Sequence, residues 1–217
     1  LAHRPEQVGH HHKWEPTFIN ELMRTLRTDD VVFDIGAEQG EFGALAATVV
    51  DGLGVHLFEP SPQVWPNIRA VWEANGLDGP GGSWPGFVAD VSRGLPVQAD
   101  WLGWPEISDG PIHAEGAFCV LTERPEIPAI TVDEYTRFAV PNIVMIDVEG
   151  AEALVLRGMR RTLRRAERLV VFVSIHPPDF LARFDSTQEE VFQLLSSAGY
   201  VGRWLGFDHE AHWVFTR

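Results

Sequence analysis

The chain of 217 residues has a single cysteine and few basic residues. The first scarcity bears on the compartment of the protein, and the second on its binding partners. Cys119 has no partner for an intrachain disulfide, so an oxidising compartment is not favoured. Basic residues number 17 against 31 acidic ones, a formal net charge of -14. Such a charge repels phosphate backbones, so we expect no nucleic-acid partner. The one basic run, residues 157–168, is interpreted as the exposed surface of an amphipathic helix.

Long apolar runs are also missing. No segment approaches the length needed to span a membrane, and the His-rich, charged N-terminal residues lack the apolar core of a signal peptide. We therefore expect no membrane partner and a cytoplasmic protein. The triplet His10-His11-His12 is not favoured as a metal site, because consecutive side chains diverge along a helix or strand.

No long linker divides the chain, and its 45% of hydrophobic residues suffices for one sizeable core. We predict a single domain over residues 1–217, with an N-terminal helical cap over 1–28 and an irregular insertion over 91–129. Assembly of identical copies is left open.

Short apolar runs alternate with helical patterns along most of the chain. Strands are predicted over 31–35, 55–58, 87–89, 117–121, 143–146 and 169–175. Two further strands, 200–205 and 212–216, form a C-terminal hairpin. This order predicts an α/β fold with a doubly wound, Rossmann-like sheet, mostly parallel and ending in an antiparallel hairpin.

Helix boundaries carry their own signals. The helix after the second strand begins either at Ser61-Pro62 or at Pro66, because proline is tolerated only in a first turn. A helix over 151–165 is expected to break near Gly158. Thr187 and Glu190 have the spacing of a capping box, which predicts the start of another helix.

The turn after the first strand carries two glycines. Gly36 and Gly40 let the backbone approach a ligand closely, and the following helix offers free N–H groups to it. Glu59 ends the second strand roughly twenty residues beyond this turn, where an acidic side chain accepts ribose hydroxyls. The pattern predicts an adenosine-type cofactor, with Asp34 and Ala37 completing the turn.

Two cofactor classes share this geometry. Ala37-Glu38 breaks the Gly-x-Gly-x-x-Gly pattern of dinucleotide enzymes, and Glu38 is a poor neighbour for a pyrophosphate. A cofactor with an ammonium group and no phosphate tolerates acidic residues there. This favours S-adenosylmethionine over the dinucleotide of a nucleotide-dependent oxidoreductase. Asp90, at the end of the expected third strand, either binds the adenine amino group or is a surface carboxylate.

A second cluster of candidates follows the later strands. Asp147 ends the predicted central strand, Glu149 and Glu152 follow it, and His176 ends the next strand. Asp147, Glu149 and His176 are candidates for the base that removes a proton from an acceptor. Asp147 also borders the cofactor, and Glu152 is a candidate for acceptor binding. The alternative to a base is that Asp147, His176 and Glu149 bind a divalent ion together. These residue types can ligate such an ion, but we do not expect a metal here.

Several stretches together resemble the FkbM family of methyltransferases: Val32 to Gly40, Phe58-Glu59-Pro60-Ser61-Pro62, Thr131-Val132-Asp133-Glu134-Tyr135, and Asp147-Val148-Glu149-Gly150-Ala151-Glu152. The resemblance implies methyl transfer from S-adenosylmethionine to a hydroxyl of a sugar or natural product. Trp14-Glu15 is similar to an aromatic–acid pair near the start of that family's domain and is assigned to the acceptor. Trp84, Trp101 and Trp104 are further acceptor-site candidates. A binding module that holds the cofactor without catalysis is the remaining alternative.

Overall fold

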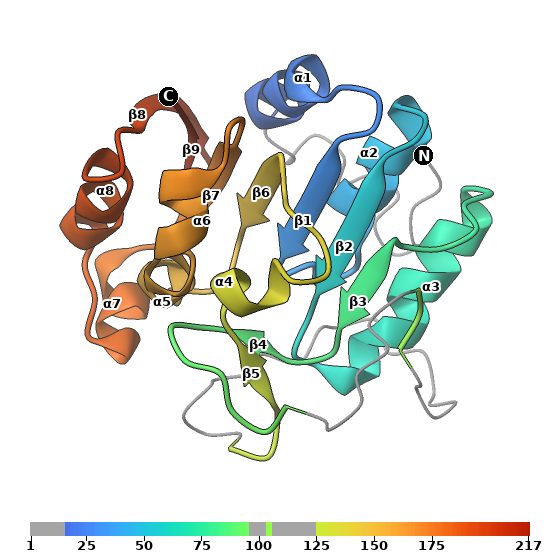
Figure 1. Cartoon of the computed structure of the whole chain (residues 1–217), viewed down its shortest axis with the longest axis horizontal. Coiled ribbons are helices and arrows are strands. Elements are labelled where there is room, and N and C mark those ends of the chain that lie inside the picture. Colours follow the sequence, from blue (N-terminus) through green and yellow to red (C-terminus); the bar gives the residue numbers. More distant parts are fainter. Residues whose placement is uncertain (1–15, 96–102, 106–124) are drawn as a thin grey trace.

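A computed structural model describes residues 16–95, 103–105 and 125–217. Its centre is a seven-stranded sheet in the order β3-β2-β1-β6-β7-β9-β8 (Figure 1). The parallel strands are β3 (Gly82–Trp84), β2 (Gly54–Phe58), β1 (Val31–Ile35), β6 (Ile143–Ile146) and β7 (Val170–Ile175). The antiparallel pair is β8 (Val201–Phe207) and β9 (Ala211–Thr216), so the predicted Rossmann-like sheet with its C-terminal hairpin is confirmed.

Helices cover both faces of the sheet. One face packs on α1 (Pro16–Thr25), α2 (Glu41–Val49) and α3 (Trp65–Ala74). The other packs on α4 (Val132–Tyr135), α5 (Glu152–Gly158), α6 (Arg160–Arg165) and α8 (Gln188–Ser196). Successive strand residues alternate between the two cores: Val32 faces α2, whereas Phe33 faces α4. Because both faces are buried, the strands are continuous apolar runs.

The third strand of the sheet was wrongly placed by the sequence pattern. It is β3, which pairs with β2, whereas Phe87 and Val88 form β4 (Phe87–Val88) in a separate two-stranded sheet with β5 (Ala129–Ile130). The sequence Gly82-Ser83-Trp84 has no β-branched residue, so its propensity for a strand is low. Residues 117–121, predicted as a strand, lie outside the described residues.

The helix signals were largely right. A 3₁₀ turn, η3 (Pro62–Val64), begins after Ser61, and α3 then begins at Trp65, so Pro66 lies within its first turn. The helix breaks where predicted, since α5 ends at Gly158 and α6 begins at Arg160. Only glycine fits at position 158, because a Cβ there would lie 2.0 Å from the Ala89 carbonyl oxygen. Thr187 caps α8 as predicted, but the Glu190 carboxylate accepts hydrogen bonds from Arg157 on α5.

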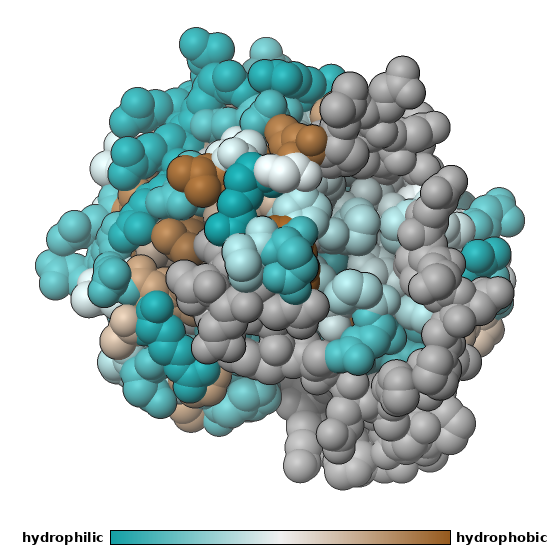
Figure 2. Space-filling model, turned by 90° about the horizontal axis from the view of Figure 1, so that it is seen from below, coloured by the Kyte–Doolittle hydropathy of each residue, from teal (hydrophilic) through white to brown (hydrophobic). Residues whose placement is uncertain are grey.

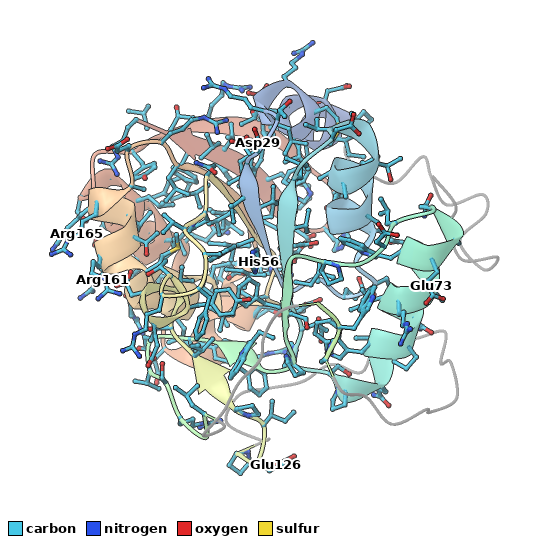
Figure 3. All side chains as sticks on the ribbon, turned by 45° about the vertical axis from the view of Figure 1, so that its right-hand side comes forward. Asp29, His56, Glu73, Glu126, Arg161 and Arg165 are labelled. Carbon is cyan, nitrogen blue, oxygen red and sulfur yellow. The ribbon has the colours of Figure 1, made fainter. Side chains whose placement is uncertain are left out.

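The basic run of residues 157–168 includes the surface helix α6. The α6 arginines are exposed, and Figure 3 shows Arg161 and Arg165 pointing outward from that helix. In the same view His56 lies within the sheet. Among the described residues, no helix is both long and apolar enough to cross a membrane.

Candidate active site

The parallel strands all end at one edge of the sheet, and the predicted site residues follow these ends. Gly36 follows β1, Glu59 follows β2, Asp147 follows β6 and His176 follows β7. Figure 2 views the molecule from below, the direction in which the strand arrows of Figure 1 point, and mostly hydrophilic residues are visible outside the grey atoms.

The glycines of the first turn are required by protein packing. Gly36 has a φ of 83°, and a Cβ there would lie 1.7 Å from the Asp147 carbonyl oxygen. Gly40 has a φ of 69°, and a Cβ there would lie 2.5 Å from a methyl of Ile68 on α3. The sequence predicted that the two glycines let the backbone approach a ligand. In the structure they also let the turn pack against Asp147 at the end of β6 and against α3. The N–H groups of Gly36 and Ala37 both donate to the Phe58 carbonyl, which fixes the turn beside β2.

Glu59 joins this turn to the end of β2. Its carboxylate accepts hydrogen bonds from the Glu38 N–H at 3.0 Å and the Ser61 N–H at 2.8 Å. Burial raises the pKa of Glu59 to about 8, against the lowering effect of these two hydrogen bonds. Each carboxylate oxygen keeps a second lone pair, so the group can also accept hydroxyls of a bound ribose.

Polar side chains in the two segments that Glu59 joins lack hydrogen-bond partners among the described residues. Both polar atoms of the buried Gln39 amide, and the buried hydroxyl of Ser61, have no hydrogen-bond partner among the described residues. Buried polar groups are normally hydrogen-bonded. Unpartnered donors and acceptors in both of these segments therefore fit a polar ligand such as the nucleoside part of a cofactor.

Two predicted cofactor contacts are placed elsewhere. The buried Asp34 carboxylate accepts a hydrogen bond from the Gly43 N–H in α2, so it fastens α2 to β1 instead of facing a ligand. Asp90 follows β4 in the small sheet and lies 3.8 Å from Arg157. The prediction that Asp90 binds adenine assumed that residues 87–89 form the third strand of the main sheet. Because β4 belongs to the small sheet instead, that reason for placing Asp90 beside adenine no longer holds.

Four carboxylates surround His176. Its Nδ1 lies 2.7 Å from Glu152 Oε1, while its Nε2 lies 3.3 Å from Glu149 Oε2, 3.6 Å from Glu210 Oε2 and 3.9 Å from Asp147 Oδ1. The structure thus brings together all three predicted catalytic residues. Glu149 is the most open of the four carboxylates, with its side chain 53% exposed.

Glu152 does not face an acceptor as predicted. Its side chain is 0% exposed, and its Oε1 also accepts the Gly150 N–H. Glu149 and Glu152 reach opposite nitrogens of the imidazole, because Glu149 precedes the helix in a left-handed conformation with a φ of 55°. Glu152 is therefore a positioning residue for His176.

Glu210 was missed by the sequence analysis. It stands just before β9, which pairs antiparallel with β7 in a register that places Ala211 opposite Ile175. This pairing brings Glu210 next to His176, although 34 positions separate them in the printed sequence. Only the register of the hairpin, which no local pattern encodes, could have indicated it.

The cluster has unusual electrostatics. Burial alone would lower the pKa of His176, but the hydrogen bonds to Glu149 and Glu152 outweigh it and raise the pKa to about 11. Burial and the neighbouring Glu210 raise the pKa of Asp147 well above its ordinary value. Burial likewise raises the pKa of Glu210 to about 7, opposed by His176. One imidazolium therefore faces several carboxyl groups that resist ionising together.

Other acceptor candidates divide into three cases. Trp84 is wrong as a contact residue, because its ring is buried in the core and its Nε1 donates to the Phe87 carbonyl. Trp104 packs edge-to-face on Trp72 of α3. Trp14, Glu15 and Trp101 lie outside the described residues, as do Cys119 and the histidine triplet.

The chain is similar to known methyltransferases. Residues 34–201 match a family of protein domains, the methyltransferase FkbM domain. The hexuronic acid methyltransferase AglP of Haloferax volcanii is 30% identical over 166 residues, which are 75% of this chain and 62% of that protein. The chain therefore spans less than two thirds of that relative's length.

Solved structures share the fold. Precorrin-6y C5,15-methyltransferase from Geobacter metallireducens matches 92% of this chain and 85% of its own, with a TM-score of 0.53 and 12% identity. A SAM-dependent methyltransferase from Aquifex aeolicus matches 98% and 93%, with a TM-score of 0.52 and 12% identity.

Proposed function

The chain belongs to the FkbM family of methyltransferases, and from this we propose that it transfers a methyl group from S-adenosylmethionine to a hydroxyl of a sugar or other small molecule. The observation that carries the proposal is the placement of His176, Glu149 and Asp147 at the strand ends adjoining the Gly36 turn. Methyl transfer needs an acceptor, a proton-accepting group and a cofactor at one place, and the residues that we assign to these three roles lie along this edge.

Glu59 and the Gly36–Gly40 turn are assigned to the cofactor. The carboxylate of Glu59 would accept the ribose hydroxyls, and the orphaned side chains of Gln39 and Ser61 would supply further hydrogen bonds. S-adenosylmethionine, when bound, supplies a methyl group on a positively charged sulfur, which leaves as a neutral thioether. The acidic site, with Glu38 and Asp147 nearby, favours a cationic ligand.

Glu149 is assigned as the group that accepts the hydroxyl proton. It is the most exposed carboxylate of the cluster, so an acceptor can reach it, and His176 orients it from 3.3 Å. Glu152 in turn holds the other imidazole nitrogen, which fixes the ring. The acceptor oxygen loses its proton to Glu149 as it bonds to the methyl carbon.

The acceptor class is taken from the 30% identical relative, whose name specifies a hexuronic acid. A glucuronic acid glycoside is therefore the first acceptor to test, and a neutral glucoside is its matched comparison. The net charge of -14 supports a small-molecule acceptor over a nucleic acid.

A methyl-transfer assay with Glu149→Gln tests the proposal. Loss of a general base lowers kcat by about 10²- to 10⁴-fold, while the dissociation constant for S-adenosylhomocysteine stays unchanged because Glu149 does not hold the cofactor. Glu73→Gln, an exposed glutamate on α3, is the control and should keep full activity. Full activity of Glu149→Gln would remove the assigned role. Tight S-adenosylhomocysteine binding without methylation of any hydroxylated acceptor would favour the non-catalytic alternative.

A further inference from the structure

Asp147, His176 and Glu210 converge from three strand ends on one small region at the carboxyl edge of the sheet. Each offers one donor atom, and the three atoms all lie within 4.8 Å of one another. We propose that these three side chains bind a divalent metal cation. The site differs from the predicted alternative, because Glu210 replaces Glu149 in the ligand set.

The spacing of the donors suits a common ion. His176 Nε2 lies 3.9 Å from Asp147 Oδ1 and 3.6 Å from Glu210 Oε2. Protein ligands bind divalent ions such as Mg²⁺ and Zn²⁺ at about 2.0–2.2 Å, so neighbouring donors on one ion lie about 3–4 Å apart. Small side-chain movements are enough to close this set around a cation.

Glu210 is the independent sign of a missing ligand. Its side chain is 7% exposed, and its Oε2 has no hydrogen-bond partner among the described residues. Two imidazole nitrogens lie near this oxygen, His176 Nε2 at 3.6 Å and His209 Nε2 at 3.1 Å. The His209 side chain is 82% exposed. Because no hydrogen bond within the described residues occupies this buried oxygen, its lone pairs are free to bind a cation.

Glu152 would orient the histidine ligand of such a site. A histidine ligand usually donates its other ring N–H to a carboxylate, which fixes the tautomer and the ring orientation. Glu152 Oε1 lies 2.7 Å from His176 Nδ1, so Nε2 is the nitrogen left to face Asp147 and Glu210. The buried Oε2 of Glu152 also lacks a hydrogen-bond partner within the described part of the chain.

A second group of possible ligands shares Glu210 but is less suited. Asp208, Glu210 and His212 also lie within the same distance limit. Asp208 Oδ1, however, already accepts the Glu210 N–H and lies 3.2 Å from His212 Nε2, while His212 Nδ1 pairs with the Ser174 hydroxyl. These contacts hold the hairpin turn in place and aim Glu210 at His176.

The role of the cation rests on the proposed function, although its binding does not. A cation at these three ligands would lie beside Glu149 and could bind the acceptor oxygen. Coordination lowers the pKa of a bound hydroxyl, so Glu149 would remove its proton more readily. The cation would also offset the repulsion between this acidic edge and an anionic sugar.

Titration of the chelator-treated, dialysed protein with MnCl₂ tests the proposal without any turnover. Bound Mn²⁺ loses the electron paramagnetic resonance signal of the free ion, which gives a dissociation constant directly. We expect one bound Mn²⁺ per chain. At 100-fold excess over that constant, binding to the native state raises Tm by about 5–10 °C. Absence of saturable binding by MnCl₂ and by MgCl₂ would overturn the proposal, whether or not the protein methylates an acceptor.

Near-isosteric variants locate the ion. Asp147→Asn and Glu210→Gln should each weaken Mn²⁺ binding at least about tenfold, while Glu73→Gln should bind as the wild type does. Because both substitutions relieve crowding of like charges, Tm of the metal-free protein should not fall, whereas a merely structural role predicts that it does. Binding lost in Asp208→Asn but kept in Asp147→Asn would place the ion at the hairpin group and contradict the proposal.

Discussion

A single carboxylate, that of Glu59, links two parts of the candidate cofactor site. It holds the N–H of Glu38 in the first turn and the N–H of Ser61 beyond β2, and it remains able to accept ligand hydroxyls. Glu38 has a φ of 46°, which is unfavourable for a residue other than glycine. Glu59 therefore stabilises the turn, in addition to the ligand contact that we propose for it.

Glu59→Ala should accordingly show two effects. A hydrogen bond to a charged group is worth about 1.5–3 kcal/mol, so at a pH above the raised pKa of Glu59 the affinity for S-adenosylhomocysteine should fall about 10- to 150-fold by titration calorimetry. The free energy of unfolding should fall as well, because two backbone N–H groups lose their partner. Glu73→Ala should change neither quantity. Unaltered affinity in Glu59→Ala would mean that the ribose binds elsewhere.

His56 provides a separate test in the core of the sheet. It lies buried on β2 with Nδ1 3.0 Å from the Tyr135 hydroxyl, and burial lowers its pKa from 6.5 to about 4. Since the unfolded chain takes up this proton at a higher pH than the folded protein, stability falls as the pH drops from about 6.5 to 4. Below that window both states are protonated and the loss is complete.

His56→Gln removes this proton uptake and keeps an acceptor for Tyr135. Between pH 8 and pH 5 the wild type should lose about 2 kcal/mol more unfolding free energy than the variant. Urea denaturation of both proteins at the two pH values measures the difference. Equal losses would show that His56 titrates normally in the folded protein.

At the scale of elements, the turn between β1 and α2 depends on its glycines for packing. Gly36 and Gly76 both have positive φ, at 83° and 71°, but only Gly36 has protein atoms where a Cβ would lie. The two positions therefore separate backbone strain from steric overlap.

Gly36→Ala should lower the free energy of unfolding by more than about 4 kcal/mol or prevent folding, since the new Cβ meets the Asp147 carbonyl. Gly76→Ala should lower it by only about 1–2 kcal/mol, because nothing lies within 4 Å of its Cβ position. Chemical denaturation compares the two. Similar, small losses in both variants would mean that the turn can move away from β6.

Elements with strong local signals were predictable, and those set by distant contacts were not. The runs of β1, β6 and β7, the Thr187 cap and the break at Gly158 follow from local chemistry. β3 was missed because its sequence has little strand propensity, and its place is set by pairing with β2. Likewise, Asp147, Glu149 and His176 follow strand ends that the pattern identifies, whereas Glu210 reaches the site through hairpin register.

At the scale of the whole molecule, the sheet brings the candidate cofactor site and the carboxylate–imidazole cluster to one edge. Gly36 lies against Asp147, so the first turn adjoins the end of the central strand β6. The match to the FkbM family across residues 34–201 covers both halves of this edge but ends before Glu210. The proposed metal ligand Glu210 therefore lies outside the matched residues.

The proposed function requires that this edge binds S-adenosylmethionine. Titration calorimetry with S-adenosylhomocysteine and, in a parallel experiment, with NAD measures this binding. We predict saturable binding of S-adenosylhomocysteine at one site per chain, weakened by Glu59→Ala, and no binding of NAD. Binding of NAD without binding of S-adenosylhomocysteine would contradict the proposed function and indicate a nucleotide-dependent oxidoreductase.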